Sequence, residues 1–131
     1  MSKKITFLSI ADVLQLHTDT LQHEGGGQGT RDRGLLDSAV MMAQQQFAGE
    51  YLHPSIPAMA AAYLFHICNN HPFVDGNKRC AALASLVFLY INDVEKLPEP
   101  NELEEITLQV AAGDMGKQEL IEWFERALNK N

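Results

Sequence analysis

The sequence predicts an all-α protein, a compact bundle of about six helices around a central buried helix. Apolar residues recur at helical spacing along most of the chain. Capping residues, prolines and glycines divide it into segments of helix length. One of these segments is apolar on nearly all sides, which is typical of a helix at the centre of a bundle. With 131 residues and 46% hydrophobic content, the chain is expected to form a single domain over residues 1–131.

The first half of the chain predicts three helices. Ser9, with Asp12 three residues later, starts the first helix with a capping box. A second helix is expected from about Arg33 to Gln46, where Leu, Ala and Val residues give one apolar face. A third is expected over residues 57–70, because its first residue is a proline suited to the first turn of a helix. The segment Phe47–Pro57 between them is irregular and partly extended, and one short β-hairpin is possible in the fold.

The second half predicts three more helices. Residues from about Asn77 to Asn92 form the segment that is apolar nearly all round, and this is expected to be the central helix. Two prolines then break the chain, Asn101 caps a fifth helix, and Gly113 ends it. A last amphipathic helix spans about Lys117 to Asn129. The other helices should pack around the central one.

Charge and composition narrow the class of protein. The formal net charge of −7 argues against binding of nucleic-acid phosphates as the main activity. The longest apolar stretch, Cys80–Ile91, is about a dozen residues, short of the roughly 20 that a membrane span requires, and no signal peptide is recognisable. Cys68 and Cys80 are not spaced as a redox pair, so a disulfide framework is not expected. We therefore expect a cytoplasmic protein that binds neither nucleic acid nor membrane directly.

The most informative segment is His71–Arg79, which reads His-Pro-Phe-Val-Asp-Gly-Asn-Lys-Arg and comes directly before the central helix. A general base that works near neutral pH is best supplied by an imidazole, here that of His71. Phosphate oxygens favour Lys78, Arg79 and the free backbone N–H groups of a helix N-terminus. A divalent metal that bridges phosphates favours a hard oxygen ligand, which Asp75 offers. The segment therefore predicts a nucleotide-phosphate site with its own base.

This segment resembles the signature of the Fic/Doc superfamily, His-x-Phe-x-Asp/Glu-Gly/Ala-Asn-(Gly or Lys)-Arg. The matching residues are His71, Phe73, Asp75, Gly76, Asn77, Lys78 and Arg79. Lys78 before the arginine is similar to the death-on-curing (Doc) branch of toxin–antitoxin toxins. Fic AMP-transferases typically carry Gly there, and a second Arg where this chain has Ala82. The Leu16-His17 pair, the glycine-rich turn and the Arg31–Leu36 segment also look Doc-like, so the resemblance covers nearly the whole chain.

The resemblance implies a role for each residue of the signature. His71 would be the general base that takes the proton of the target hydroxyl, and Asp75 would bind Mg²⁺ or, alternatively, act only as an N-cap. Gly76 would let the backbone approach a phosphate, and Asn77 would either orient His71 or hold a phosphate oxygen. Lys78 and Arg79 would bind different phosphate oxygens, since adjacent helical residues point about 100° apart. Phe73 is expected to anchor the loop in the core.

The Doc-like features imply a protein kinase toxin as the first hypothesis. Such a toxin would transfer the γ-phosphate of ATP, with Mg²⁺, to a hydroxyl of translation elongation factor Tu and arrest translation. A small antitoxin, whose disordered tail folds as a helix into a groove of the domain, would silence it. The second hypothesis is a Fic-type AMP-transferase with the same base and the same ATP. The third is a catalytically silent regulator, against which the complete set of signature residues argues.

Other segments give weaker signals. Phe47–Pro54 lies where the family places a flap that holds the target chain in extended form, although a bare surface turn is an open alternative. The Thr20-x-x-x-Glu24-Gly25 pattern resembles a self-inhibitory element, but Ala82 replaces the arginine with which it would pair, so inhibition by another chain is favoured. The scattered histidines do not predict a zinc site. His17 and His66 are expected to be hydrogen-bonded core residues.

Overall fold

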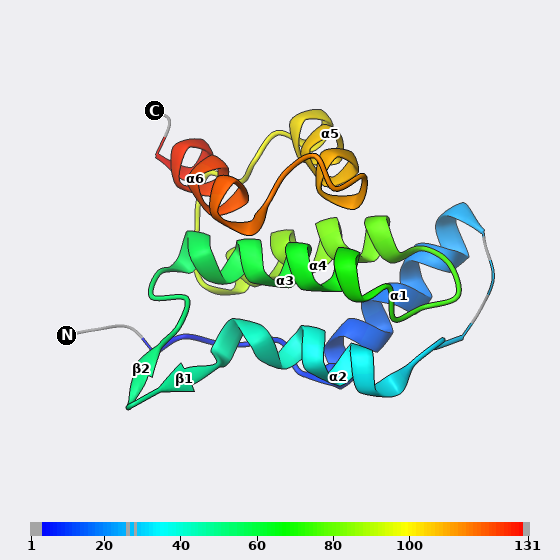
Figure 1. Ribbon diagram of the computed structural model, residues 1–131. Helices are drawn as coiled ribbons and strands as arrows, with labels where there is room; N and C mark the ends of the chain where they lie inside the picture. The colour runs from blue at the N-terminus through cyan, green and yellow to red at the C-terminus, as the bar shows by residue number, and fades with distance from the viewer. Residues whose placement is uncertain (1–3, 26, 28, 130–131) are drawn as a thin grey trace.

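The computed structural model describes residues 4–25, 27 and 29–129 (Figure 1). In this part of the chain, six α-helices, one 3₁₀ helix and one two-stranded antiparallel hairpin follow one another. The all-α fold class is therefore confirmed, and a short hairpin forms, which begins at Gln46, one residue before the expected segment. The elements are α1 (Ile10–Glu24), α2 (Arg33–Met41), η1 (Met42–Gln44), β1 (Gln46–Phe47), β2 (Glu50–Tyr51), α3 (Ile56–Asn70), α4 (Asn77–Ile91), α5 (Pro100–Ala111) and α6 (Lys117–Leu128).

The helices form three layers (Figure 1). Helices α3 and α4 run antiparallel in the middle, with α1 and α2 on one side and α5 and α6 on the other. The most enclosed helix is α3, which packs against α2, α4, α5 and α6, whereas α4 leaves Lys78 and Arg79 at its start and Tyr90 near its end exposed. The central helix is thus α3 rather than the expected 77–92 helix. The run of small residues Ala60–Ala62 explains this, because it lets neighbouring helices approach closely.

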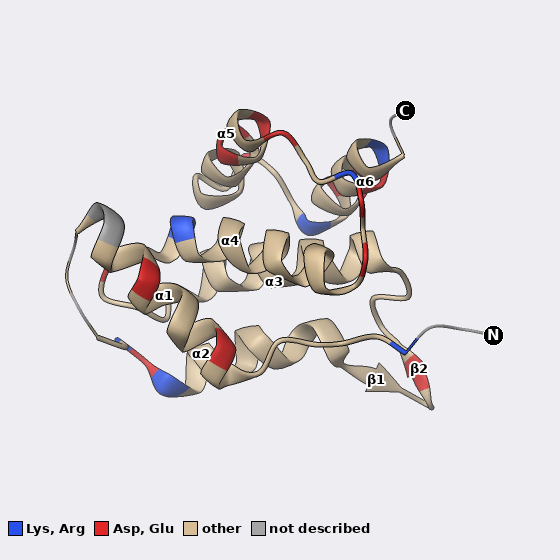
Figure 2. Cartoon of the chain, turned by 180° about the vertical axis from the view of Figure 1, so that it is seen from behind, with Lys and Arg blue, Asp and Glu red and all other residues tan. Residues whose placement is uncertain are grey.

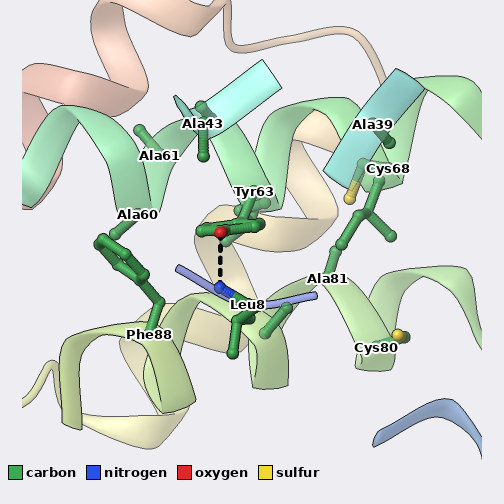
Figure 3. Close-up of a cluster of buried hydrophobic side chains, with 14 of the residues drawn as sticks. Leu8, Ala39, Ala43, Ala60, Ala61, Tyr63, Cys68, Cys80, Ala81 and Phe88 are labelled. Carbon is green, nitrogen blue, oxygen red and sulfur yellow. Dashed lines mark hydrogen bonds between the residues drawn. The ribbon is translucent and has the colours of Figure 1, made fainter. Parts of the chain in front are cut away.

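A buried hydrogen bond ties the N-terminal segment to this core (Figure 3). The backbone N–H of Leu8 donates to the hydroxyl of Tyr63 on α3 over 2.9 Å. The Tyr63 ring packs on Phe88 of α4 with 5.1 Å between ring centroids, and all three residues are buried. Directly after Leu8, the Ser9 side chain accepts from the N–H of Asp12 and completes the expected capping box. Helix α1 therefore starts from a fixed point and runs along α4.

Two helix ends differ from the sequence-based expectation. Helix α2 ends at Met41, before the expected Gln46, because the chain passes through η1 into the hairpin, whose turn places Ala48 and Gly49 at positive φ (53° and 82°). Tertiary structure here overrides a locally helical composition. Helix α5 is capped by Glu99, which accepts from the N–H of Glu102, rather than by Asn101. A proline at the first helical position favours this earlier start.

Charge is distributed unevenly over the outer surface (Figure 2). Acidic residues lie on α1, α2, α5 and α6, while the N-terminal end of α4 carries the adjacent cations Lys78 and Arg79. Two of the ten Lys and Arg residues of a protein of net charge −7 thus stand next to each other at the start of α4. In the described part of the chain, no helix has both the length and the apolar character needed to cross a membrane.

Candidate active site

The signature forms the loop His71–Gly76 between the C-terminus of α3 and the N-terminus of α4. His71 is the C-cap of α3 and has left-handed backbone angles, φ 51° and ψ 53°. A non-glycine residue adopts this conformation at a cost of about 1–2 kcal/mol unless its surroundings hold it. Arg31 provides such support, because its guanidinium donates to the carbonyl oxygens of His71 (2.8 Å) and Asn70 (3.1 Å). A residue outside the signature therefore fixes the backbone of the candidate base.

Asn77 and Phe73 brace the loop from inside. The Asn77 side chain accepts from the N–H of Phe73 (2.9 Å) and donates to its carbonyl oxygen (3.0 Å). Phe73 is fully buried and Asn77 is 5% exposed, so this pair of bonds is shielded from water. The expected role of Phe73 as a core anchor is confirmed. Asn77 was expected to orient His71 or to hold a phosphate oxygen. In the structure its side chain instead bonds to the backbone of Phe73 and fixes the conformation of the loop.

Asp75 presents an ionised carboxylate at the surface of the loop. One oxygen accepts from the N–H of Gly76 (2.8 Å) and the other from the N–H of Gly27 (3.3 Å). These two bonds, and after them the positive charge of Arg79, hold the pKa of the Asp75 carboxyl below its usual range. Asp75 is not the N-cap of α4, since that position belongs to Gly76 at φ 81°. An exposed carboxylate that stays ionised suits a hard divalent cation.

The first turn of α4 supplies the groups suited to phosphate. Gly76 caps the helix without a side-chain hydrogen bond, and Lys78 and Arg79 follow with exposed side chains. The guanidinium of Arg79 also lies 3.5 Å from the carbonyl oxygen of Gly25. Backbone N–H groups and two cations at one helix N-terminus form an arrangement that favours anions.

One cleft of about 860 Å³ brings these groups together. All the residues expected to form the site line it, namely His71, Asp75, Gly76, Asn77, Lys78 and Arg79. Its opposite wall is largely apolar and comes from α4 and α5, with Leu83, Leu86, Leu103 and Leu108 among its residues. Ala82, three residues after Arg79 on α4, is also part of the lining. The size and mixed lining are those of a small-molecule site.

The hairpin does not adjoin this cleft. It precedes α3, whereas the signature loop follows α3 at the other end (Figure 1). A helix of 15 residues separates the two ends by about 22 Å. The segment beside the signature is instead Gly29–Asp32: the N–H of Val74 donates to the carbonyl of Gly29 (3.1 Å), and Thr30 forms a β-bridge with Phe73. The expected flap at Phe47–Pro54 is therefore wrongly placed for a target held near the base.

Two residues outside the signature, His17 and Arg31, contact the backbone of the signature loop, and the sequence did not predict these contacts. His17 is buried, as expected, but its ring nitrogen also lies 2.7 Å from the carbonyl oxygen of Asp75. Arg31 belongs to the family-like Arg31–Leu36 segment, but its contacts with the end of α3 do not follow from sequence spacing, because they join residues 40 positions apart. For the Thr20–Gly25 inhibitory pattern, the side chain of Glu24 lies outside the described part of the chain, and Thr20 is on the rim of the cleft.

Comparison with known proteins identifies the family. A sequence profile described as the Fic/DOC family matches residues 7–89, a range that includes the whole signature. A curated relative named Toxin Doc, from Mycolicibacterium smegmatis (strain ATCC 700084 / mc(2)155), is 39% identical over 92 residues, which is 69% of this chain and 71% of that protein. Together with the all-α fold and the signature loop between α3 and α4, these matches show that the chain belongs to the Fic/DOC family.

Proposed function

We propose that this protein is a Doc-type toxin that transfers the γ-phosphate of ATP to a hydroxyl of a protein target and so arrests translation. The observation that carries the proposal is the cleft in which His71, Asp75 and the first turn of α4 meet. Its lining combines one base, one ionised carboxylate and two cations. Membership of the Fic/DOC family and similarity to a protein named Toxin Doc support the same reading.

The residues suggest how the transfer proceeds. His71 accepts the proton of the target hydroxyl as its oxygen bonds to the γ-phosphorus, and the bond to the bridging oxygen of the leaving ADP breaks. Lys78, Arg79 and the backbone N–H groups at the start of α4 stabilise the charge on the phosphate oxygens. Asp75 fits Mg²⁺, because this ion takes one or two carboxylates together with waters and phosphates; when bound, it supplies further charge neutralisation. Holding both reactants in one cleft lowers the entropic cost of reaching the transition state.

Two positions favour phosphate transfer over AMP transfer. Lys78 brings a cation to the cleft where AMP-transferring enzymes have Gly, and Ala82 stands where these enzymes have a second arginine. Both changes alter which phosphate is held next to His71. We therefore infer that the γ-phosphate, rather than the α-phosphate, faces the incoming hydroxyl.

The experiment that tests this proposal follows the label of ATP. The protein is incubated with Mg²⁺, purified translation elongation factor Tu and ATP labelled at either the γ- or the α-phosphate, with His71→Ala as the control. Label transferred only from the γ-position, and absent with the control, is the expected result. Label from the α-position would instead establish an AMP-transferase and overturn the interpretation of Lys78 and Ala82. No His71-dependent label, in this reaction or in a bacterial lysate, would refute both enzymatic functions.

We further propose that an antitoxin silences the protein, as a relative named as a toxin suggests. The partner expected is a small protein whose disordered tail folds as a helix on binding. Its test is the same labelling reaction with the cognate antitoxin added. The expected result is loss of the His71-dependent label at a one-to-one ratio, and undiminished label at excess antitoxin would contradict the proposal.

A further inference from the structure

The peptide group between Asp75 and Gly76 has a partner outside the signature. Nε2 of His17, on α1, lies 2.7 Å from the carbonyl oxygen of Asp75. A carbonyl oxygen only accepts hydrogen bonds, so Nε2 carries the proton and donates. The His17 ring is 4% exposed and stacks on Phe73, with 3.7 Å between centroids and 7° between planes. Packing thus fixes the ring, while its N–H points at the backbone of the signature.

This bond determines the direction of the whole peptide group. In a planar trans peptide, the carbonyl and the N–H of the next residue point in opposite directions. Since the carbonyl of Asp75 faces His17, the N–H of Gly76 faces away from His17. Its present acceptor is the Asp75 carboxylate (2.8 Å), and both Asp75 and Gly76 line the cleft. The orientation seen here therefore keeps the carbonyl of Asp75 on the side of His17 and the N–H of Gly76 on the opposite side, next to the Asp75 carboxylate.

Glycine alone would not keep this orientation. Gly76 has φ 81°, and reversing the peptide would take φ to about −100°, which glycine adopts as readily. Space is not what demands glycine here, because an added Cβ would meet its nearest atom, Nε2 of His17, at an ordinary 3.5 Å. A reversed peptide would aim the carbonyl oxygen of Asp75 at an anionic phosphate, which it would repel. The freedom that lets the backbone approach phosphate thus also permits the unproductive orientation.

We propose that His17 is a positioning residue whose hydrogen bond locks the Asp75–Gly76 peptide with its N–H toward the nucleotide phosphate. His17 itself lies behind the loop and acts through the backbone. The part of this inference that concerns the phosphate rests on the proposed function. The peptide orientation does not, and it can be measured without nucleotide.

Two variants separate the hydrogen bond from the packing of the ring. His17→Phe keeps a ring to stack on Phe73 but removes the donor. His17→Gln removes the ring but keeps a side-chain N–H at a similar reach. Both are made in the His71→Ala background, so that nucleotide is bound without turnover, and their thermal midpoints are compared with that of the parent to verify folding.

The first readout is the set of φ-dependent HN–Hα couplings of Gly76 in the nucleotide-free protein, and the second is the Kd for Mg²⁺·ATP by calorimetry. We expect His17→Phe to change the couplings and to weaken binding about tenfold, the effect of one hydrogen bond, while His17→Gln leaves the couplings unchanged and binding within about threefold. Unchanged couplings in a folded His17→Phe variant would overturn the lock. An equal loss of Mg²⁺·ATP affinity in both variants would assign the effect to the packing of the ring. That result would also overturn the proposed role of the hydrogen bond. A parent that does not bind Mg²⁺·ATP would refute the proposed function, while the couplings would still decide the peptide orientation.

Discussion

Two groups of side chains, one buried around His17 and one half-buried around Lys117, hold different parts of this bundle and use the imidazole of histidine in opposite ways. In the first group, His17 donates to the backbone of the signature and stacks on Phe73. In the second, the ammonium of Lys117, at the start of α6, lies 3.1 Å from Nε2 of His53 and 3.2 Å from Nε2 of His66 on α3. The imidazoles of the second group therefore accept. In the first group the imidazole donates to the backbone of the signature loop, whose conformation matters for a ligand. In the second group the imidazoles accept from a lysine of the same protein, and neither histidine is among the residues that line the cleft.

Burial controls the charge of the second group. Desolvation, followed by the nearby charge of Lys117, lowers the pKa of His66 to about 4 and lowers the pKa of His53 as well. Desolvation also lowers the pKa of Lys117. Two neutral rings around one cation form a stable arrangement at neutral pH, because each ring offers a lone pair and no competing charge. This group is therefore expected to fasten α6 to α3 rather than to take part in chemistry.

The contrast between the signature side and the Lys117 group is tested most strongly by replacing one histidine on each side, the candidate base His71 and His66. His71→Ala is expected to lower the rate of γ-phosphate transfer by about 10²–10⁴-fold, the usual contribution of a general base. His66→Gln should keep the rate per folded molecule near that of the wild type, since the amide oxygen of Gln can still accept from Lys117. Initial rates with labelled ATP measure both. A His66→Gln rate as low as that of His71→Ala would show that the two regions are not functionally separate.

A second prediction concerns stability on the signature side. Asn77→Ala removes both hydrogen bonds to the buried Phe73 backbone and is expected to lower the free energy of unfolding by about 2–4 kcal/mol. Asn69→Ala is the matched control, because exposed Asn69 makes one bond to the carbonyl of Phe65. It should change stability by no more than about 0.5 kcal/mol. Urea unfolding at neutral pH compares the two variants. An equal loss of unfolding free energy in both would mean that the buried hydrogen bonds of Asn77 stabilise the fold no more than the exposed bond of Asn69.

The third prediction sharpens the contrast through pH. Because the folded-state pKa of His66 is about 4, below the 6.5 of the unfolded chain, the unfolded state binds more protons between these values. Stability is therefore fully present above about pH 6.5 and is lost as the pH falls toward 4, by about 1–3 kcal/mol. Urea unfolding at several pH values measures this loss. The double variant His53→Gln with His66→Gln should flatten the curve, and an unchanged curve would assign the acid sensitivity to other groups.

The last prediction concerns the cysteines and needs no substitution. Cys68 and Cys80 are unpaired and buried, and desolvation raises the pKa of each thiol to about 12. Since the thiolate is the reactive form, a thiol reagent at pH 8 should react at least about 100-fold more slowly with the folded protein than with the urea-unfolded chain. Cys68 is on the wall of the cleft, so fast labelling of this residue would indicate that the signature side opens in solution.

Local chemistry predicted some features of the fold and the site, and tertiary packing decided the others. The capping box at Ser9, the start of α3 and the run from Asn77 to Ile91 followed from local chemistry and appear nearly where expected. The signature residues lie on one short loop, so their convergence on one cleft also followed from the sequence. The contacts of His17 and Arg31 did not, because they join segments far apart in the chain. That the hairpin lies at the end of α3 opposite the signature could not be inferred either, because this depends on how the helices pack.

The signature loop also joins helix ends of opposite polarity. His71 stands at the C-terminus of α3, where the macrodipole carries partial negative charge, and Gly76 stands at the N-terminus of α4, where it carries partial positive charge. The C-terminus of α3 would stabilise the positive charge of a protonated His71, and the N-terminus of α4 would stabilise negative charge on phosphate. The loop is thus built across a local electric field that runs in the direction in which the reaction would separate charge.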